Sequence, residues 1–499
     1  MSQSETPLPS PERHAAARLR PMAAATSTRA GAPGGTPEGE QAGPRVAPSK
    51  AGPVEESRPL QPPPAIALPA LAQMLRFSQR QIEFVFDARA RHGDVFEMRA
   101  GVKGGAIVTC HPEHARSLFT AKPEHVPTLT SESPLRPIVG ADSVLTANGD
   151  RHMRQRKLLL PPFHGAAIER YSETIRDATE REIDRWPTGF AFALAPRIQA
   201  ITLQVIMSAI FGIDGTPAPG TPERRLCTTI SQLTAASTSP LAKLGELMNF
   251  GRPEPVGPMR TGVAMLDHAT YPVIARRRTA EDLSERKDIL SLLLAARTED
   301  GQALSDKELR DELLTLVLAG FETTANSLAW TWERLLRTPD AHERLRASVR
   351  GGDDEAEEVI EHTILEGMRS RPVIPIVGRR VTVPWQLGEY VVPAGTAISV
   401  SILLVHHRED LYEDPFDFRP ERWRGRKPGT YEWLPFGGGT RRCLGAQLAM
   451  AEMRVVIEAM ARRLDLSADR PEAEHAQHRN VTMLASRGAR AVVEHRRGV

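Results

Sequence analysis

The sequence predicts a mainly α-helical domain with small β-sheets, preceded by a region of different composition. Helical periodicity of apolar residues dominates from about residue 63 to the C-terminus. Strand patterns are short and cluster in two regions, 95–110 and 381–401. One helical pattern, which starts at Ser305, is about 33 residues and about 50 Å long. A helix of that length crosses a whole domain, so we expect the other elements to pack around it.

Residues 1–62 form the region of different composition. They are rich in Pro, Ala, Gly, Ser and Glu and contain no Phe, Trp or Tyr. Such a segment buries too little apolar surface to offset the entropy lost when the chain is ordered. We therefore expect a disordered N-terminal segment at 1–62 and one folded domain at 63–499. An arm that binds a partner is the alternative for the first region.

The first elements of the folded domain can be predicted in chain order. Strands are expected at 95–99 and 106–110, where β-branched and aromatic residues concentrate. The segment 198–213 is almost entirely apolar and is interrupted by two glutamines, which predicts a buried core helix.

The long helix has clear boundaries. Ser305 is a good N-cap residue, and Glu308 three residues later completes a capping-box pattern. The helical pattern ends before Pro339, which cannot continue it. Strands are expected further on at 381–392 and 397–401, joined by a Pro-Ala-Gly turn.

Composition narrows the class of protein. The 499 residues carry 64 basic and 62 acidic side chains, a net charge of +2, so nucleic acid is not an expected partner. The 3 cysteines are scattered, which excludes a disulfide framework and a four-cysteine zinc site and fits a reducing cytoplasm. The longest apolar segment, 198–213, is shorter than the roughly 20 residues of a membrane span. No signal-peptide pattern is present.

One cysteine lies in a sequence that suits a metal ligand. Cys443 follows the glycines at 437–439 and precedes a helical pattern at 445–452. Glycines let the loop bend and turn backbone amides toward the sulfur. The positive end of a helix lowers the pKa of a thiol and favours the thiolate. A glycine loop with a buried structural cysteine is the alternative on these features alone.

The whole string from Phe436 to Gly445, Phe-Gly-Gly-Gly-Thr-Arg-Arg-Cys-Leu-Gly, resembles the Phe-x-x-Gly-x-Arg-x-Cys-x-Gly signature of cytochromes P450. The resemblance implies the cytochrome P450 fold, in which haem lies between a long central helix and the cysteine loop. It implies haem b as the cofactor, with the Cys443 thiolate as a ligand of the iron. The implied activity is that of a soluble, bacterial-type haem-thiolate monooxygenase.

The middle of the long helix contains poor helix formers, Ala-Gly-Phe-Glu-Thr-Thr-Ala at 319–325. Gly320 permits a local opening of the helix, which the Thr323 hydroxyl could face with Glu322 beside it. A glycine kink with a back-bonded threonine is the alternative. The segment resembles the acid–alcohol pair of P450 monooxygenases. That resemblance implies that Glu322 and Thr323 are catalytic and guide protons during the activation of dioxygen.

Three further residues are expected to form a structural network. Glu366 and Arg369 have the spacing of the Glu-x-x-Arg motif in the family's K helix, although this spacing also occurs elsewhere in the chain. Their distance from Cys443 along the chain is similar to that in the family. Arg422 belongs to Pro-Glu-Arg-Trp, which resembles the family's Pro-Glu-Arg-Phe motif. The resemblance implies a buried Glu366–Arg369–Arg422 network on the haem side of the core.

Cations are expected beside the two haem propionates. The resemblance makes Arg441, two residues before the cysteine, one of them. The segment 149–157 resembles the family's C helix, with His152 where the family commonly has tryptophan. The resemblance implies that His152 and Arg156, four residues apart, lie on one face of that helix.

Arg379 is a third candidate for a propionate contact, and neighbouring Arg380 is the alternative to it. Phe436 and Gly437 of the cysteine loop complete the expected cofactor-binding residues.

The walls of a substrate pocket follow from position in the family. They are expected at 127–144, 233–267, 314–323, 373–377 and 481–483. The central stretches are apolar and carry few charges. We expect a hydrophobic or amphipathic substrate such as a fatty acid, terpenoid, steroid or polyketide.

Electrons are expected from a separate protein. The chain ends soon after Cys443 and leaves no room for a flavin or iron–sulfur domain, so a ferredoxin or flavodoxin with its reductase is the expected donor. Arg151, Arg154 and Lys157 either dock this donor or form a solvated basic face. We expect a cytoplasmic monomer, without a membrane span, that uses O₂.

Two other functions compete with this one. The first is a haem-thiolate peroxygenase, dehydratase or isomerase that does not activate O₂, and the second is a haem-binding sensor without turnover. The Glu322-Thr323 pair argues against both, because it serves proton delivery. A dinucleotide fingerprint that starts at Gly437 fails because Arg442 stands where glycine is needed.

Overall fold

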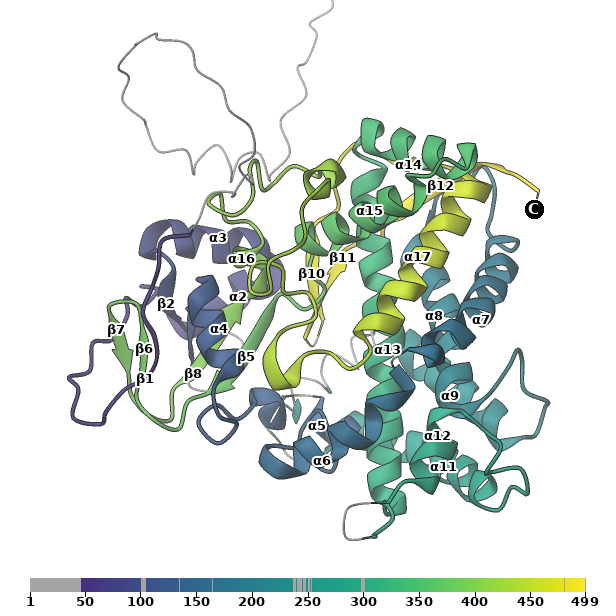
Figure 1. Cartoon of the computed structure of the whole chain (residues 1–499), viewed down its shortest axis with the longest axis horizontal. Coiled ribbons are helices and arrows are strands. Elements are labelled where there is room, and N and C mark those ends of the chain that lie inside the picture. Colours follow the sequence, from purple (N-terminus) through teal and green to yellow (C-terminus); the bar gives the residue numbers. More distant parts are fainter. Residues whose placement is uncertain are drawn as a thin grey trace, which may run out of the picture.

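The computed structural model describes residues 46–99, 105–133, 135–163, 165–236, 239, 245, 248–249, 252, 254–297, 301–479 and 481–498. Helices gather around one long central helix, and most of the strands lie to one side of them (Figure 1). The prediction of a mainly helical domain with small sheets is confirmed.

The α-helices are α2 (Ala70–Gln79), α3 (Gln81–His92), α4 (Pro112–Thr120), α5 (Arg136–Val139), α6 (Gly149–Leu159), α7 (Ala166–Ile183), α8 (Leu194–Phe211), α9 (Pro222–Ala236), α11 (Pro258–Arg278), α12 (Ile289–Ala295), α13 (Asp306–Leu335), α14 (Pro339–Gly351), α15 (Ala356–Ser370), α16 (Ile402–Val405) and α17 (Ala446–Arg463). Short 3₁₀ helices are η1 (Leu129–Glu132), η2 (Pro161–Phe163), η3 (Pro420–Trp423) and η4 (Gly439–Arg441).

The strands are β1 (Ala51–Pro53), β2 (Val95–Met98), β3 (Ala106–Thr109), β4 (Phe192–Ala193), β5 (Ile376–Arg380), β6 (Trp385–Leu387), β7 (Tyr390–Val392), β8 (Ala397–Ser401), β9 (Leu464–Ala468), β10 (Ala476–Arg479), β11 (Thr482–Ala485) and β12 (Arg490–Arg496). They form sheets in the orders β2-β3-β8-β5, β1-β6-β7 and β4-β12-β9, together with the hairpin β10-β11. Of these pairings only β3 with β8 is parallel.

The predicted strands at 95–99 and 106–110 are β2 and β3, which pair antiparallel with Val95 opposite Thr109. The pattern at 381–392 is a tight hairpin of β6 and β7 rather than one strand. Gly388 makes its turn with φ +65°, a conformation that glycine adopts without strain.

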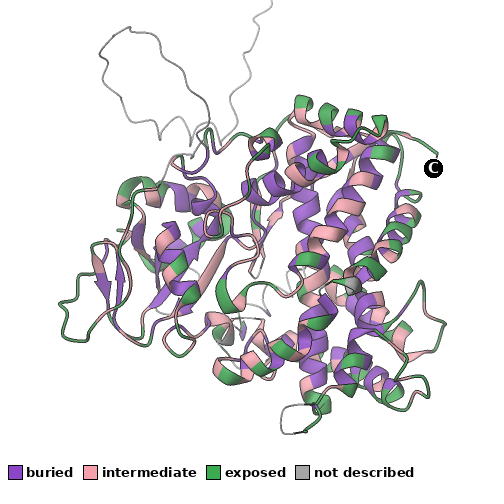
Figure 2. Ribbon diagram, viewed as in Figure 1, coloured by how far each residue is buried: buried purple, intermediate pink, exposed green. Residues whose placement is uncertain are grey.

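The long central helix α13 begins where the sequence predicts. The Ser305 hydroxyl accepts from the Glu308 amide at 3.2 Å, and the Glu308 carboxylate accepts from the Ser305 amide at 2.9 Å. The capping box is therefore confirmed. Most of α13 is buried along its length (Figure 2), which is why it can carry site residues inside the protein.

Two hydrophobic clusters form the core. The larger one joins α8, α13, α7 and α17, and the smaller one lies under the sheet β2-β3-β8-β5 together with α3 and α4. Trp433, Met450 and Ala476 pack against both clusters. Among the described helices, α8 alone is long and apolar enough to cross a membrane, and its residues are mostly buried inside the protein.

The expectation for the N-terminal region needs one correction. Residues 1–45 lie outside the described residues. From residue 46 the chain is attached to the domain: β1 pairs with β6, Ser49 is hydrogen-bonded to His114 at 2.8 Å, and the Gln61 amide donates to Val391 at 3.0 Å. Backbone bonds to an edge strand hold this segment, and composition does not report such bonds.

Candidate functional site

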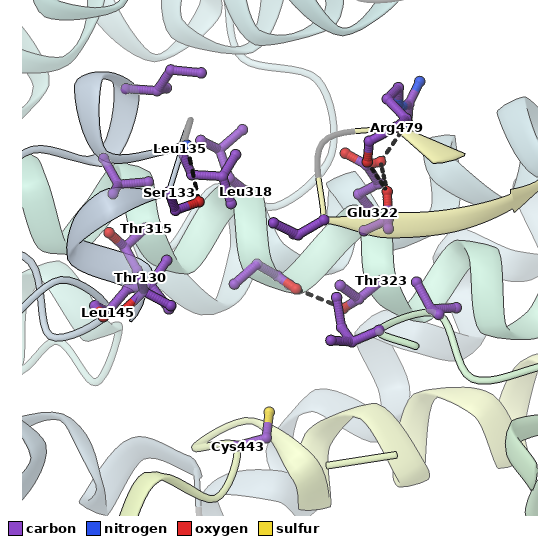
Figure 3. A pocket seen from close by; sticks show the side chains of 18 of the residues that line it. Thr130, Ser133, Leu135, Leu145, Thr315, Leu318, Glu322, Thr323, Cys443 and Arg479 are labelled. Carbon is purple, nitrogen blue, oxygen red and sulfur yellow. Dashed lines mark hydrogen bonds and ion pairs between the residues drawn. The ribbon is translucent and has the colours of Figure 1, made fainter. Parts of the chain in front are cut away.

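A cavity of about 1490 Å³ lies between α13 and the loop that carries Cys443 (Figure 3). Each of the five predicted wall segments contributes to its lining. Examples, one from each segment, are Leu135, Leu266, Leu318, Val373 and Val481. The walls are mainly apolar, as the sequence predicts.

Helix α2 adds a wall that the sequence did not predict. Met74, Phe77 and Ser78 line the cavity from this helix. Helical periodicity could have marked Phe77 as a buried residue. It could not show which distant element this residue faces.

The Cys443 loop is shaped by its glycines. Gly437 and Gly439 have φ of +65° and +64°. A Cβ at Gly439 would lie 1.8 Å from the carbonyl oxygen of Phe119 in α4, so glycine is required there. The Cys443 amide donates to the Phe436 carbonyl at 3.0 Å and closes the loop.

The thiol of Cys443 points into the cavity, two residues before the N-cap of α17 (Figure 3). Its side chain is exposed only in the sense that it faces this internal space. Burial raises the pKa of the thiol above its ordinary 9.0, while the Gly445 amide, Arg156 and Arg442 act in the opposite direction. The sequence predicts that the helix lowers the pKa of this thiol. In the protein without a cofactor that prediction is wrong, because burial outweighs the positive groups.

Three predicted arginines gather on one side of this cavity. Arg156 lies on α6, Arg379 on β5 and Arg441 in the cysteine loop, and all three line the cavity. Burial lowers the pKa of Arg379 to about 10, and burial together with the charges of Arg379 and Arg156 lowers that of Arg441 to about 10. Within the described part of the chain, none of the three forms an ion pair with an acidic side chain.

His152 lies among these arginines, as the sequence predicts. Burial, and then the charges of Arg441, Arg156 and Arg379, lower its pKa to about 4, so the imidazole is neutral at pH 7. It can donate one hydrogen bond in that state.

The choice between Arg379 and Arg380 follows from their surroundings. Arg379 is buried, stacks on Phe119 at 5.4 Å and lines the cavity. Arg380 is partly exposed and binds the Glu132 carboxylate through two nitrogens, at 2.8 Å for the closer contact. Arg379 is therefore the one that faces the cofactor space.

This arrangement fits a cofactor with two carboxylates. A cluster of one buried and two half-buried cations without acidic partners among the described residues is unfavourable by itself. The two propionates of haem would compensate it, while Cys443 would be presented to the iron on one face of the ring. Phe436, whose ring packs at 5.9 Å from Trp433, lines the same space.

Glu322 and Thr323 lie on α13 across the cavity from Cys443 (Figure 3). The helix is continuous through Gly320, so the expected local opening is absent. Gly320 instead packs closely on α8, because a Cβ there would lie 2.4 Å from Ile206. The Thr323 hydroxyl donates to the Ala319 carbonyl at 2.6 Å, which is the back-bonded alternative.

The carboxylate of Glu322 points away from Thr323. It accepts from Arg479 of β10 at 2.5 Å and from the Thr482 hydroxyl of β11 at 3.4 Å. Sequence reasoning missed both partners, because they lie about 160 residues further on and belong to no motif.

Glu366, Arg369 and Arg422 lie together in one buried network. Arg369 binds both carboxylate oxygens of Glu366, at 2.8 and 2.7 Å, and Arg422 binds one of them at 3.1 Å. The Trp423 indole donates to the other oxygen at 3.1 Å and the Arg419 amide to the first at 2.9 Å. Tryptophan in place of phenylalanine thus adds a hydrogen bond to the network.

The predicted basic face of α6 is partly neutralised by the chain itself. Arg151 pairs with Asp142 at 2.7 Å, and Arg154 approaches Glu308 at 4.0 Å. Asn148, just before α6, was missed by sequence reasoning. Its side-chain oxygen accepts from Arg441 at 3.0 Å and from the Thr128 amide at 2.9 Å, which connects the cysteine loop to the cavity wall.

Comparison with known families identifies the family of this chain. The family model described as Cytochrome P450 matches residues 62–491. The chain belongs to the cytochrome P450 family. Its cofactor is haem, bound through a cysteine thiolate, and its general activity is that of a haem-thiolate monooxygenase.

Two similar proteins come from Mycobacterium tuberculosis strain H37Rv. "Putative cytochrome P450 138" is 36% identical over 438 residues, which are 87% of this chain and 96% of that protein. "Putative cytochrome P450 137" is 37% identical over 406 residues, 80% of this chain and 83% of that protein.

A solved structure has a similar fold. "Retinoic acid bound cyanobacterial CYP120A1" aligns with a TM-score of 0.72 and covers 88% of this chain and 100% of its own. At 23% sequence identity this likeness concerns the fold.

Proposed function

We propose that this protein inserts one atom of O₂ into a hydrophobic substrate, with the balance RH + O₂ + 2 e⁻ + 2 H⁺ → ROH + H₂O. One observation carries the proposal. Cys443 on one wall and Glu322 with Thr323 on the facing wall line the same mainly apolar cavity. This arrangement supports the proposal, in which Cys443 is the cofactor ligand, Glu322 and Thr323 deliver protons, and the apolar walls leave space for the substrate.

Haem, when bound, supplies the redox chemistry that activates O₂. Arg156, Arg379 and Arg441 hold its propionates, and His152 adds a hydrogen bond. The Glu322 carboxyl takes up protons from solvent and passes them toward the Thr323 hydroxyl. The apolar walls exclude other water from the reacting space.

The substrate in this proposal is an apolar or amphipathic small molecule. Hydrophobic side chains from five separate segments line the cavity, which supports this class. The solved structure with a similar fold holds retinoic acid, a terpenoid-like carboxylic acid. We infer a substrate from the fatty acids, terpenoids, steroids or polyketides.

Electrons come, in this proposal, from a separate ferredoxin or flavodoxin with its reductase, in the cytoplasm. The three cysteines Cys110, Cys227 and Cys443 are free thiols, which fits a reducing compartment. Lys157 and the partly paired arginines of α6 are the proposed docking face for the acidic donor.

A peroxide-driven or non-oxygenating reaction is the second candidate. The back-bonded Thr323 and the pairing of Glu322 with Arg479 favour it, because neither side chain of the acid–alcohol pair contacts the other. Turnover with a donor system and O₂, compared with turnover with peroxide alone, separates the two candidates.

The ligand assignment is tested by Cys443→Ala. The variant should lose the red-shifted Soret band that the reduced carbon monoxide complex of the wild type gives. If the band persists, Cys443 is not the ligand.

The proton-delivery role is tested by Glu322→Gln and Thr323→Ala. Each should lower product formation by about 10²-fold while the haem content and the Soret band stay unchanged. Product formation at the wild-type rate in both variants would contradict O₂ activation by this pair. The substrate screen for these assays follows the iron spin state as apolar compounds displace axial water.

A further inference from the structure

The carboxylate of Glu322 is attached to a β-hairpin rather than to its catalytic neighbour. The Arg479 guanidinium lies 2.5 Å from the Glu322 carboxylate, and the Thr482 hydroxyl lies 3.4 Å from it. Figure 3 shows Glu322 turned toward Arg479 and away from Cys443. In this position Glu322 cannot hand a proton to Thr323, whose hydroxyl is bound to Ala319.

Arg479 and Thr482 are the last paired residues of the hairpin β10-β11, on either side of its turn. They pair with each other in the strand register, and the Thr482 hydroxyl also donates to the Arg479 carbonyl at 2.8 Å. Glu322 therefore binds both strands at their ends. The tip is attached to α13 through this carboxylate.

Met483, the residue after Thr482 in β11, is held on two sides. The Trp330 indole of α13 donates to the Met483 carbonyl at 3.0 Å, and the Met483 amide donates to the Val373 carbonyl at 2.8 Å. All of these groups are buried. The hairpin is thus fixed at Met483, one residue from Thr482, whereas Arg479 at the end of β10 contacts α13 through Glu322.

The tip is also part of the cavity wall. His478, Arg479, Val481 and Thr482 all line the cavity, and His478 packs edge-on against Phe77 of α2 at 5.6 Å. A molecule that fills the apolar part of the cavity meets the same residues that hold Glu322. The Glu322–Arg479 pair is partly exposed, with 21% and 14% of each side chain accessible, so water can replace either partner.

We propose that Arg479 and Thr482 form a latch that couples filling of the cavity to the orientation of Glu322. Here the latch means the three-residue contact Glu322–Arg479–Thr482. A substrate that presses on Val481 displaces the hairpin tip, opens the latch and frees Glu322 to turn toward Thr323. Arg479 is then a positioning residue for the reaction. This inference rests on the proposed function of Glu322 in proton delivery.

Reciprocal coupling makes the latch measurable without turnover. If a long ligand opens the latch, then a variant without the latch must bind that ligand more tightly, by the same free energy. A small ligand that does not reach the hairpin must bind equally well in both. The probes are 1-dodecylimidazole and imidazole, which both bind haem iron and differ in the apolar chain.

The experiment titrates haem-loaded wild type, Arg479→Gln, Glu322→Ala and the double variant with each probe and follows the Soret band. We expect 1-dodecylimidazole to bind Arg479→Gln and Glu322→Ala at least about fivefold more tightly than the wild type. The double variant should bind no more tightly than either single variant. Imidazole should bind all four within about twofold. Arg479→Lys, which keeps the cation, should restore most of the wild-type affinity.

Arg487→Gln is the matched control, because Arg487 pairs with Asp469 in the same C-terminal region and does not line the cavity. Its affinity for both probes should equal that of the wild type. Hydrogen exchange without probe gives a second readout: amides of β10 and β11 should exchange faster in Arg479→Gln, and those of β9 should not.

Unchanged or weaker binding of 1-dodecylimidazole to Arg479→Gln overturns the latch, and so does an equal change for imidazole. The outcome is separable from that of the proposed function. If Glu322→Gln forms product at the wild-type rate while the four variants bind 1-dodecylimidazole as expected, the proton-delivery role is wrong and the latch stands. If Glu322→Gln forms product slowly while all four proteins bind 1-dodecylimidazole equally, the latch is wrong and the proton-delivery role stands.

Discussion

At the scale of single residues, burial gives neighbouring side chains different roles. Arg379 and Arg380 are adjacent in β5, so their side chains leave opposite faces of the sheet. Arg379 enters the cavity without an acidic partner among the described residues, and Arg380 meets Glu132 near the surface. The same residue type thus lines the cavity at one position and forms a surface ion pair at the next.

Arg379→Ala should weaken the retention of haem. A charge-assisted hydrogen bond in a buried site contributes about 1.5–3 kcal/mol, which corresponds to about a tenfold to hundredfold faster loss of haem. Transfer of haem to excess apomyoglobin measures the rate. Arg380→Ala is the control and should stay within about twofold of the wild type. Equal losses in both variants would show that Arg379 does not hold a propionate.

Glu366→Gln should destabilise the fold. It leaves the buried charges of Arg369 and Arg422 without compensation, which costs about 3–5 kcal/mol in such networks. Glu361→Gln on the same helix is the control, since its pair with Arg454 at 2.6 Å is partly exposed and should contribute about 1 kcal/mol or less. Thermal unfolding of the two variants measures the difference, and equal midpoints would contradict the prediction.

We expect Glu366 to make the stability of the fold sensitive to acid. Burial raises the pKa of Glu366, but the pairing with Arg369 and Arg422 outweighs burial and holds the pKa below its ordinary 4.5. A lowered pKa in the folded state stabilises the protein above pH 4.5, and this contribution is lost as the pH falls through the lower value. The wild type should lose stability below pH 4.5 more steeply than Glu366→Gln. Parallel curves would contradict this.

At the scale of elements, α13 positions the site and also holds the loop that closes over the cavity. Buried acids near its N-terminal end bind backbone amides of residues 142–144: Asp311 accepts from Asp142 at 3.1 Å and Glu312 accepts from Val144 at 3.0 Å. Val144 and Leu145 in this loop line the cavity. One helix thus positions both Glu322 with Thr323 and a wall of the pocket.

We expect the contact between Glu312 and the loop at 142–144 to depend on pH. Burial raises its pKa to about 8, against the bond from the Val144 amide. Because its pKa is raised in the folded state, the contribution of Glu312 to the stability of the fold is complete below pH 4.5. It falls as the pH rises to about 8. Glu312→Gln should abolish this fall, so above pH 8 the variant should be more stable than the wild type, by at most about 5 kcal/mol.

Thermal midpoints measured between pH 5 and 9 test this expectation. Glu343→Gln, which removes an exposed acid of α14, is the control and should follow the wild type at every pH. A Glu312→Gln curve that runs parallel to the wild type would place the pH dependence elsewhere.

At the scale of the whole molecule, the cofactor space lies where the two hydrophobic clusters meet. Arg379 comes from the sheet region, while α13 and α17 belong to the helical cluster. Haem bound in this cavity would contact residues of both clusters, so it should stabilise their association. Anything that binds only the folded state raises stability, by about 4 kcal/mol at 1,000 times its Kd.

Removal of haem should therefore lower the unfolding temperature by several degrees. Calorimetry of the haem-loaded and haem-free protein measures it, and Arg379→Ala should lose part of the gain. Identical unfolding temperatures with and without haem would mean that the two clusters hold together without the cofactor.

Much of the fold and site could be predicted because the signals are local. Cys443, Glu322, Thr323 and the capping box of α13 are read from spacings within ten residues. Arg479, Asn148 and the wall from α2 could not be predicted, since each acts through a contact with a segment far along the chain. The same applies to β1, which is stabilised by backbone bonds that any residue type can make.

The close fit between Gly439 and Phe119 limits how the cysteine loop can be reused by protein engineers. The loop is shaped by its own glycines, but it packs against the Phe119 carbonyl of α4, which lies more than three hundred residues earlier in the chain. Transplanting the ten-residue motif into another helical scaffold would copy the cysteine ligand without the α4 backbone against which the loop packs. A graft that aims to hold haem must therefore carry α4 with it, and screening should treat the two segments as one unit.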